Sequence, residues 1–159
     1  MSGVALEITS TGLDEALLKI DGLADAPRIE LMEGIGRLVQ EQTRRRIEEE
    51  KTAPDGSAWR ANIAGTPLLY ASGALSRSID YAASEESVQV GTGLPYARIH
   101  QEGGEIVPKT ARMLAFQLGN RLVFSMRVRM PARPYVGLSA DNQNEIVDAA
   151  EDWVGRLIQ

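Results

Sequence analysis

The feature of this sequence that most constrains its fold is a long amphipathic segment, residues 26–50. At about 100° per residue, its apolar side chains fall on one half of a helix and its charged side chains on the other. The apolar half carries Leu31, Met32, Ile35, Leu38 and Val39, with Ile47 at its edge. This pattern predicts one long helix that packs a single face against a core.

Three residues in this segment are unusual for a helix. Gly34 and Gly36 together cost about 1–2 kcal/mol relative to alanine, which indicates either close packing of another backbone or simple tolerance. Arg46 falls inside the apolar half. We interpret it as part of a helix end that overhangs the core, since long side chains reach solvent easily. Contact with a partner subunit is the alternative.

The rest of the chain alternates between strand-like and turn-like segments. A second amphipathic helix is expected at residues 141–158, with Asp141 as its cap, and short helical stretches are expected after Thr11, at 72–80 and at 96–101. Strands are expected at 4–8, 87–91, 105–109, 113–118, 121–124 and 127–130. Gly119 and Asn120 suit a hairpin turn. Residues 51–67 have the composition of a loop. Within it, residues 52–66 have little to bury, so we expect them to be mobile or ordered by a partner.

These elements indicate an α+β protein. Its 159 residues fit one domain of common size, and we expect residues 1–159 to form one. With 43% hydrophobic but only 5% aromatic residues, the core must be mainly aliphatic. No apolar run approaches the roughly 20 residues of a membrane span, and we expect no signal peptide and no membrane partner.

Composition also narrows the chemistry. The chain has no cysteine and one histidine, which leaves no thiolate ligand or cysteine nucleophile. His100 could act as a base only with a nucleophile beside it, and no serine of the chain lies in a G-x-S-x-G motif. Gly91-Thr92-Gly93 does not continue into a phosphate-binding motif. We therefore expect no catalytic residue, metal, cofactor or small-molecule substrate.

Two features point to interactions with macromolecules. Residues 108–134 are rich in apolar side chains with poor alternation and contain three methionines, which predicts a hairpin covered by a partner. Arg127 and Arg129 share one face of a strand. That face suits a protein partner, DNA backbone or plain solvation. The net charge of −5 argues against DNA binding as the main role.

Four phrases occur in order along the chain. They are P-D-G-x-x-W (54–59), L-x-x-S-G-x-L-x-x-S-I (69–79), V-x-V-G-T-x-x-x-Y-A-x-I-H-Q-x-G-G (88–104) and M-P-A-R-P-Y-V-G-L-S (130–139). In this order they resemble the phage virion morphogenesis family, over roughly residues 28–158. The spacing between Trp59 and Leu69 is shorter than the family leads us to expect.

The resemblance implies a curved, mainly antiparallel sheet packed by one long N-terminal helix and a C-terminal helix. It implies a structural protein without catalysis that forms a ring, commonly sixfold, to complete the tail or join head to tail at the neck. A tail terminator is the alternative, and a DNA-contacting neck or packaging factor is an alternative of another class. The expected location is the virion neck or tail end, with the host cytoplasm during assembly.

By the same analogy, loop 52–67 and hairpin 105–130 would extend between subunits. The expected partners are other copies of the chain and phage neck and tail-tube proteins, with DNA as a passing contact. The expected interface residues are Arg46, Trp59, Met113, Phe116, Phe124, Arg127, Arg129 and Arg133.

Overall fold

A computed structural model describes residues 3–9 and 26–159 of the chain. The short helix expected after Thr11 lies outside the described residues. The helices are α2 (Arg28–Arg45), the π-helix η1 (Arg46–Glu50), α3 (Ala74–Arg77), α4 (Ala97–Glu102) and α5 (Ala140–Leu157). The strands are β1 (Val4–Thr9), β2 (Asp80–Ala83), β3 (Ser87–Thr92), β4 (Gly104–Ile106), β5 (Leu114–Leu118), β6 (Arg121–Ser125) and β7 (Val128–Met130).

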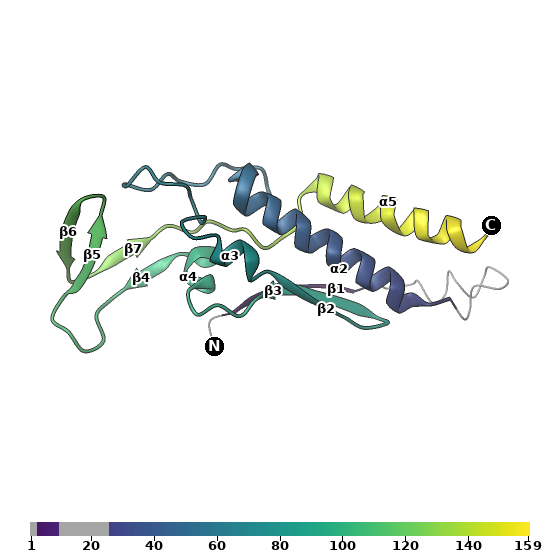
Figure 1. Cartoon of the computed structure of the whole chain (residues 1–159), viewed down its shortest axis with the longest axis horizontal. Helices are drawn as coiled ribbons and strands as arrows, with labels where there is room; N and C mark the ends of the chain where they lie inside the picture. The colour runs from purple at the N-terminus through teal and green to yellow at the C-terminus, as the bar shows by residue number, and fades with distance from the viewer. Residues whose placement is uncertain (1–2, 10–25) are drawn as a thin grey trace.

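Helix α2 forms the middle of a layered body. A sheet of order β1-β3-β2 covers one side of α2, and α5 packs on the other (Figure 1). The α+β class is therefore confirmed. The expected single curved sheet is instead divided, among the described residues, into three antiparallel sheets: β1-β3-β2, β4-β7 and β5-β6. The division occurs because α4 and the turn at Gly103 lead the chain away from the first sheet.

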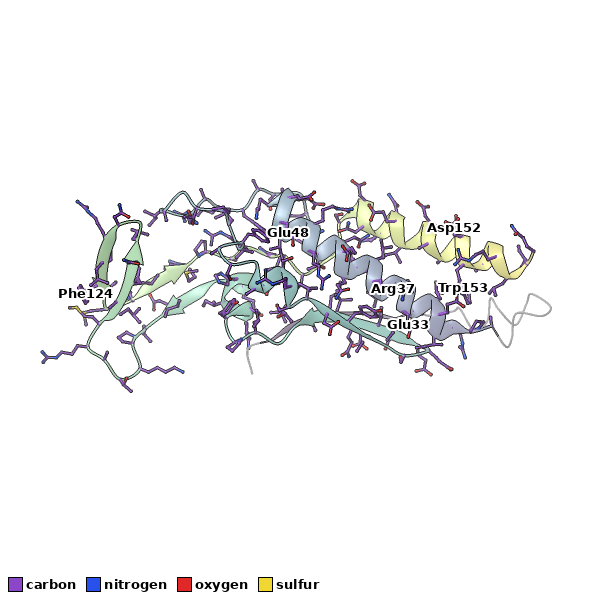
Figure 2. The ribbon with its side chains drawn as sticks, in the orientation of Figure 1. Glu33, Arg37, Glu48, Phe124, Asp152 and Trp153 are labelled. Atoms are coloured by element: carbon purple, nitrogen blue, oxygen red, sulfur yellow. The ribbon has the colours of Figure 1, made fainter. Side chains whose placement is uncertain are left out.

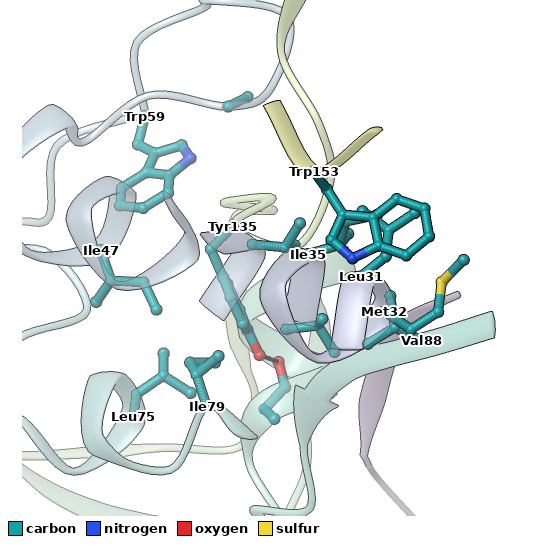
Figure 3. Packing of buried hydrophobic residues seen from close by; sticks show 14 residues of the cluster. Leu31, Met32, Ile35, Ile47, Trp59, Leu75, Ile79, Val88, Tyr135 and Trp153 are labelled. Carbon is teal, nitrogen blue, oxygen red and sulfur yellow. Dashed lines mark hydrogen bonds between the residues drawn. The ribbon is translucent and has the colours of Figure 1, made fainter. Parts of the chain in front are cut away.

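The amphipathic pattern of α2 correctly predicts its buried face. Leu31, Met32, Ile35 and Val39 are buried, and Leu38 is half-buried. Figure 3 shows Leu31, Met32 and Ile35 of this face beside Val88 of the sheet and Trp153 of α5. The core is mainly aliphatic, as the composition requires, with Trp59, Tyr135 and Trp153 as its buried large aromatics among the described residues.

The two glycines of α2 have different explanations. A side chain at Gly36 would collide with the ring of Tyr81 on β2, whereas one at Gly34 would meet open space. Close packing therefore explains Gly36, although the neighbour is a side chain rather than a backbone. Tolerance explains Gly34.

Several expected boundaries were wrong, and one is the end of the strand expected at 105–109, which stops at Ile106. The helix expected at 72–80 is only Ala74–Arg77, and Asp80 begins β2, which pairs with β3. Helix α5 is capped by Ser139 rather than Asp141: the Ser139 hydroxyl accepts a hydrogen bond from the Asn142 N–H at 3.1 Å. The Ser139 N–H in turn donates to Oδ1 of Asn142, which completes a reciprocal cap.

Candidate interaction surface

Residues 131–139, here called the strap, run through the middle of the molecule without forming a helix or strand. A buried segment of this kind must find partners for its backbone polar groups outside secondary structure. In this protein those partners come from η1, α4, α5 and the loop before α3.

The guanidinium of Arg46 is the main donor to the strap. Its Nη1 donates to the carbonyls of Tyr135 at 3.1 Å and Gly137 at 2.9 Å, and its Nη2 donates to Oδ1 of Asn142 at 2.5 Å. Arg46 is only 1% exposed. The expectation that it overhangs the core was therefore wrong, because the π-turn of η1 points Arg46 and Ile47 inward together.

Burial has an electrostatic consequence for this residue. It lowers the pKa of the Arg46 guanidinium, and the nearby Glu50 carboxylate opposes that shift. An arginine remains charged even so. The charge is compensated mainly by the strap carbonyls, since the Glu50 oxygen lies 3.9 Å from Nε.

Helix α4 holds the other side of the strap. The Gln101 side-chain oxygen accepts bonds from the backbone N–H groups of Tyr135 and Val136 at 2.9 and 3.0 Å. The Tyr135 hydroxyl donates to the carbonyl of Ala97 at 2.9 Å. These bonds join the third and fourth sequence phrases.

The P-D-G-x-x-W phrase meets the same strap. Trp59 is buried, and its indole N–H donates to the Pro134 carbonyl at 2.9 Å. A side chain at Gly137 would collide with Pro54, 2.6 Å from its ring. The expectation that residues 52–66 have little to bury was therefore wrong for the first half of that segment. Beyond Trp59 the loop is largely exposed, and Ile63 is 90% exposed.

A cavity of about 360 Å³ lies between this loop and α4. His100 and Arg133 line it, and no carboxylate does. Burial and the positive charge of Arg133 lower the pKa of His100. A histidine base of the triad type is oriented by a carboxylate, so this histidine has the opposite electrostatic setting. The His100 carbonyl has a structural role, accepting a bond from the Arg133 N–H at 2.8 Å.

The strap leads back into the most exposed part of the molecule, residues 104–130, here called the arm. Strands β4 and β7 form its stem and β5 and β6 its tip, which lies at the end of the molecule opposite α5 (Figure 1). The hairpin turn expected at Gly119-Asn120 is confirmed, with Leu118 pairing Arg121.

Both faces of the tip are apolar. Residues that face each other across an antiparallel pair lie on the same side of the sheet. One face carries Leu114, Phe116, Leu118 and Val123, all half-buried. The other face carries Leu122 and Phe124, which are 62% and 60% exposed. Figure 2 shows Phe124 on the side of the arm turned away from the helices.

The arm contains a large share of the exposed apolar surface. Six of the twelve exposed large hydrophobic residues in the described chain lie on it: Ile106, Val107, Met113, Leu122, Phe124 and Met126. A concentration of exposed apolar side chains on one extension is typical of an interaction site.

The charge of the arm is also distinct. It carries five basic residues (Lys109, Arg112, Arg121, Arg127 and Arg129) and one acidic residue (Glu105), a net charge of +4. Because the whole chain has −5, the remaining residues have −9. All five basic side chains are exposed. Arg127 lies 3.4 Å from the Glu105 carboxylate in an exposed ion pair.

The eight expected interface residues fall into two groups. Arg46, Trp59 and Arg133 are 1%, 7% and 5% exposed. They pin the strap rather than present a surface, because their polar groups bond within the chain. The other five lie on the arm: Met113, Phe124, Arg127 and Arg129 are exposed and Phe116 is half-buried.

Sequence reasoning missed the residues that organise the strap, namely Gln101, Tyr135 and Asn142. Gln101 lies in the third sequence phrase (88–104) and Tyr135 in the fourth (130–139), so the family motifs already marked both positions. Asn142 follows Ser139 by three residues, which is the spacing of a reciprocal cap.

No group of three or more metal-ligating side chains occurs among residues 3–9 and 26–159. Within the same ranges, no helix has the length and apolar character needed to span a membrane.

Comparison with known proteins identifies the family. The model of the phage virion morphogenesis family matches residues 8–155. The chain belongs to this family. The resemblance of its four phrases is thus confirmed, and the family places the chain among phage structural and assembly proteins.

One similar protein is the putative capsid assembly protein G of Escherichia phage Mu. It is 32% identical over 106 residues, which are 64% of this chain and 57% of the Mu protein. The match therefore spans little more than half of that relative's length. No solved structure matches the chain.

Proposed function

We propose that this protein is a ring-forming structural component that completes the phage tail or joins head to tail at the neck, without catalysis. Membership of the virion morphogenesis family supports an assembly role. The name of the phage Mu relative, a putative capsid assembly protein, points to the same broad process.

The observation that carries the proposal is the arm. It is apolar on both faces of its tip and lies beyond the helices of its own subunit. An isolated two-stranded hairpin is marginally stable in water, so a hairpin with two apolar faces needs a second surface. Other copies of the chain supply such surfaces, in a ring that is sixfold by family analogy, and so do neighbouring neck or tail-tube proteins.

The cavity beside His100 supports the non-catalytic part of the proposal. Its lining lacks a carboxylate, and a cation neighbours the histidine. Replacement of His100 by alanine should leave assembly intact. Loss of assembly by a His100→Ala protein that remains folded would count against this view.

A DNA-contacting neck or packaging factor is the second candidate, and the net charge of +4 on the arm favours it. Such a contact would use phosphate neutralisation and would weaken steeply with salt. The charge of −9 on the remaining residues opposes DNA binding over the rest of the surface.

The decisive experiment is deletion of the gene from its phage, followed by electron microscopy of the lysate. Completion or joining predicts DNA-filled heads and polymerised tails that fail to unite productively. Tails of abnormal length would favour the tail terminator instead. Empty heads with normal tails would favour the packaging factor, and normal infectious virions would overturn the assembly role.

A further inference from the structure

The structure contains a second surface whose chemistry complements the arm. Helix α5 carries five acidic residues and one basic residue, a net charge of −4. Four of the carboxylates are on the exposed side of α5, here called the acidic face: Asp141, Asp148, Glu151 and Asp152.

The spacing of these residues explains why they share one side. Asp148 follows Asp141 by seven residues and Asp152 follows Asp148 by four, which are helical repeats. The opposite side of α5 carries Trp153, which packs on α2 (Figure 3). Figure 2 shows Asp152 pointing away from α2, while Trp153 points toward it.

Within the part of the chain that the structure describes, no basic side chain neutralises the acidic face. None of its four carboxylates forms an ion pair with a described residue. Glu145 differs, because it bonds to Gln42 at 2.7 Å and to Arg45 at 3.3 Å. Like charges three or four residues apart destabilise a helix slightly, so Asp148, Glu151 and Asp152 repel one another unless a cation approaches.

Apolar surface accompanies the charge on both sides. Val147 lies beside the acidic face and is 53% exposed, and Ile158 just beyond α5 is 63% exposed. On the arm, the exposed apolar side chains of Leu122 and Phe124 occur together with the exposed arginines Arg127 and Arg129. The two surfaces therefore match in both their charge and their apolar content.

The arm cannot meet the acidic face of its own subunit, because the two lie at opposite ends of the elongated molecule (Figure 1). A contact between different patches on two copies is heterologous, and such contacts build rings when the rotation closes. We propose that the arm of one subunit docks on the acidic face of α5 of the next subunit. This contact rests on the ring-forming function proposed above and names its two surfaces.

Charge reversal tests the pairing. One variant carries Arg127→Glu and Arg129→Glu, and the other carries Asp148→Lys and Asp152→Lys. Neither should self-associate, but an equal mixture should, because each reversed surface finds its complement on the other variant. Sedimentation velocity at low ionic strength measures the sizes. A mixture that remains as monomeric as the separate variants overturns the proposal.

Matched controls separate this pairing from a general effect of net charge. Arg37→Glu with Arg98→Glu makes the same charge change as the arm variant, and Glu30→Lys with Glu33→Lys makes that of the helix variant. All four residues are exposed and lie outside both surfaces. These controls should associate as the original protein does, and loss of association by them would contradict a specific contact.

Cysteine cross-linking tests the geometry directly, since the chain has no cysteine of its own. After oxidation with diamide, which takes up the two electrons and two protons released per disulfide, a protein with both Met126→Cys and Asp148→Cys should form a ladder of disulfide-linked multimers, both when purified and in phage-producing cells. Neither single-cysteine protein should form the ladder. Dimers from Met126→Cys alone would indicate an arm-to-arm contact and overturn the proposal, as would absence of the ladder in both settings.

The outcomes distinguish this inference from the assembly role. A ladder from a protein whose deletion leaves virions normal would keep the contact and reject the assembly role. No ladder, combined with unjoined heads and tails in the deletion phage, would keep the assembly role and reject the contact. Salt-sensitive DNA binding that is lost with Arg127→Glu and Arg129→Glu, without any ladder, would assign the arm to DNA instead.

Discussion

At the scale of single residues, the most informative side chain is Arg46. Its position inside an apolar helix face requires polar partners, since burial of a charge is costly unless the charge is paired or hydrogen-bonded. The strap carbonyls and Asn142 supply those bonds. One guanidinium thereby connects η1, the strap and the start of α5.

Replacement of Arg46 by methionine should therefore destabilise the protein. The change leaves two buried carbonyls without their donor, and each such loss costs roughly 1–3 kcal/mol. Urea unfolding should show a loss of roughly 2–5 kcal/mol. Arg45→Met is the matched control, because Arg45 makes only exposed ion pairs with Glu50 and Glu145 and should cost under about 1 kcal/mol. Equal losses would contradict this role of Arg46.

His100 should make stability depend on pH. Burial and Arg133 lower its pKa in the folded state below the ordinary 6.5, so the unfolded chain binds this proton more readily. The stability linked to the neutral ring is complete above pH 6.5 and is lost as the pH falls through the folded-state pKa. Between about pH 7.5 and 5.5, His100→Gln should lose less stability than the original protein. Identical pH profiles would exclude this contribution.

At the scale of elements, α5 depends on one aromatic side chain. Trp153 is 3% exposed and packs in the core beside α2. Trp153→Ala should cost roughly 3–5 kcal/mol, measured by urea unfolding. Val147→Ala on the exposed side of the same helix should stay within about 0.5 kcal/mol. A small effect of Trp153→Ala would show that α5 does not depend on this side chain and is held by its other apolar contacts and its polar bonds.

The loop before α3 should be cleaved according to its two halves. Trp59 is buried, and the carbonyl of Arg60 accepts a bond from Arg133 Nε at 2.9 Å. Thermolysin should therefore cut beside the exposed Ile63 sooner than trypsin cuts after Arg60. Trp59→Ala should accelerate the tryptic cut, as followed by mass spectrometry. Rapid cleavage at Arg60 in the original protein would restore the view that the whole loop is mobile.

At the scale of the whole molecule, positive and negative charge are concentrated in different parts of the chain. The arm combines a charge of +4 with exposed apolar side chains, whereas the rest of the chain has −9. Surfaces of opposite charge steer association and lose that effect as salt screens them. The apolar part of such a contact remains at high salt.

Self-association should therefore depend on the tip of the arm. Leu122→Ser with Phe124→Ser should abolish multimers in light scattering over a wide concentration range. Stability should change by no more than about 0.5 kcal/mol, because both residues are exposed. Ile63→Ser is the matched control, since Ile63 is exposed outside the arm and should leave association unchanged. Persistent multimers of the arm variant would place the contact elsewhere.

Much of this protein follows from local sequence pattern. The periodicity of residues 26–50 predicts α2 and its buried face, because a helical repeat depends only on neighbours in the chain. The alternation of Val88 and Val90 likewise predicts β3, and Gly119-Asn120 predicts the hairpin turn. The family resemblance also follows from the four phrases alone.

Only the tertiary structure decided which partners the buried polar groups of the chain bind. The sequence places Arg46 on the apolar face, but not the strap carbonyls that meet it from 89 and 91 residues away. The same holds for Trp59 and Gln101, whose partners are distant in sequence. The placing of a basic arm and an acidic helix at opposite ends is also a tertiary result, because long-range packing sets the direction in which each element leaves the core.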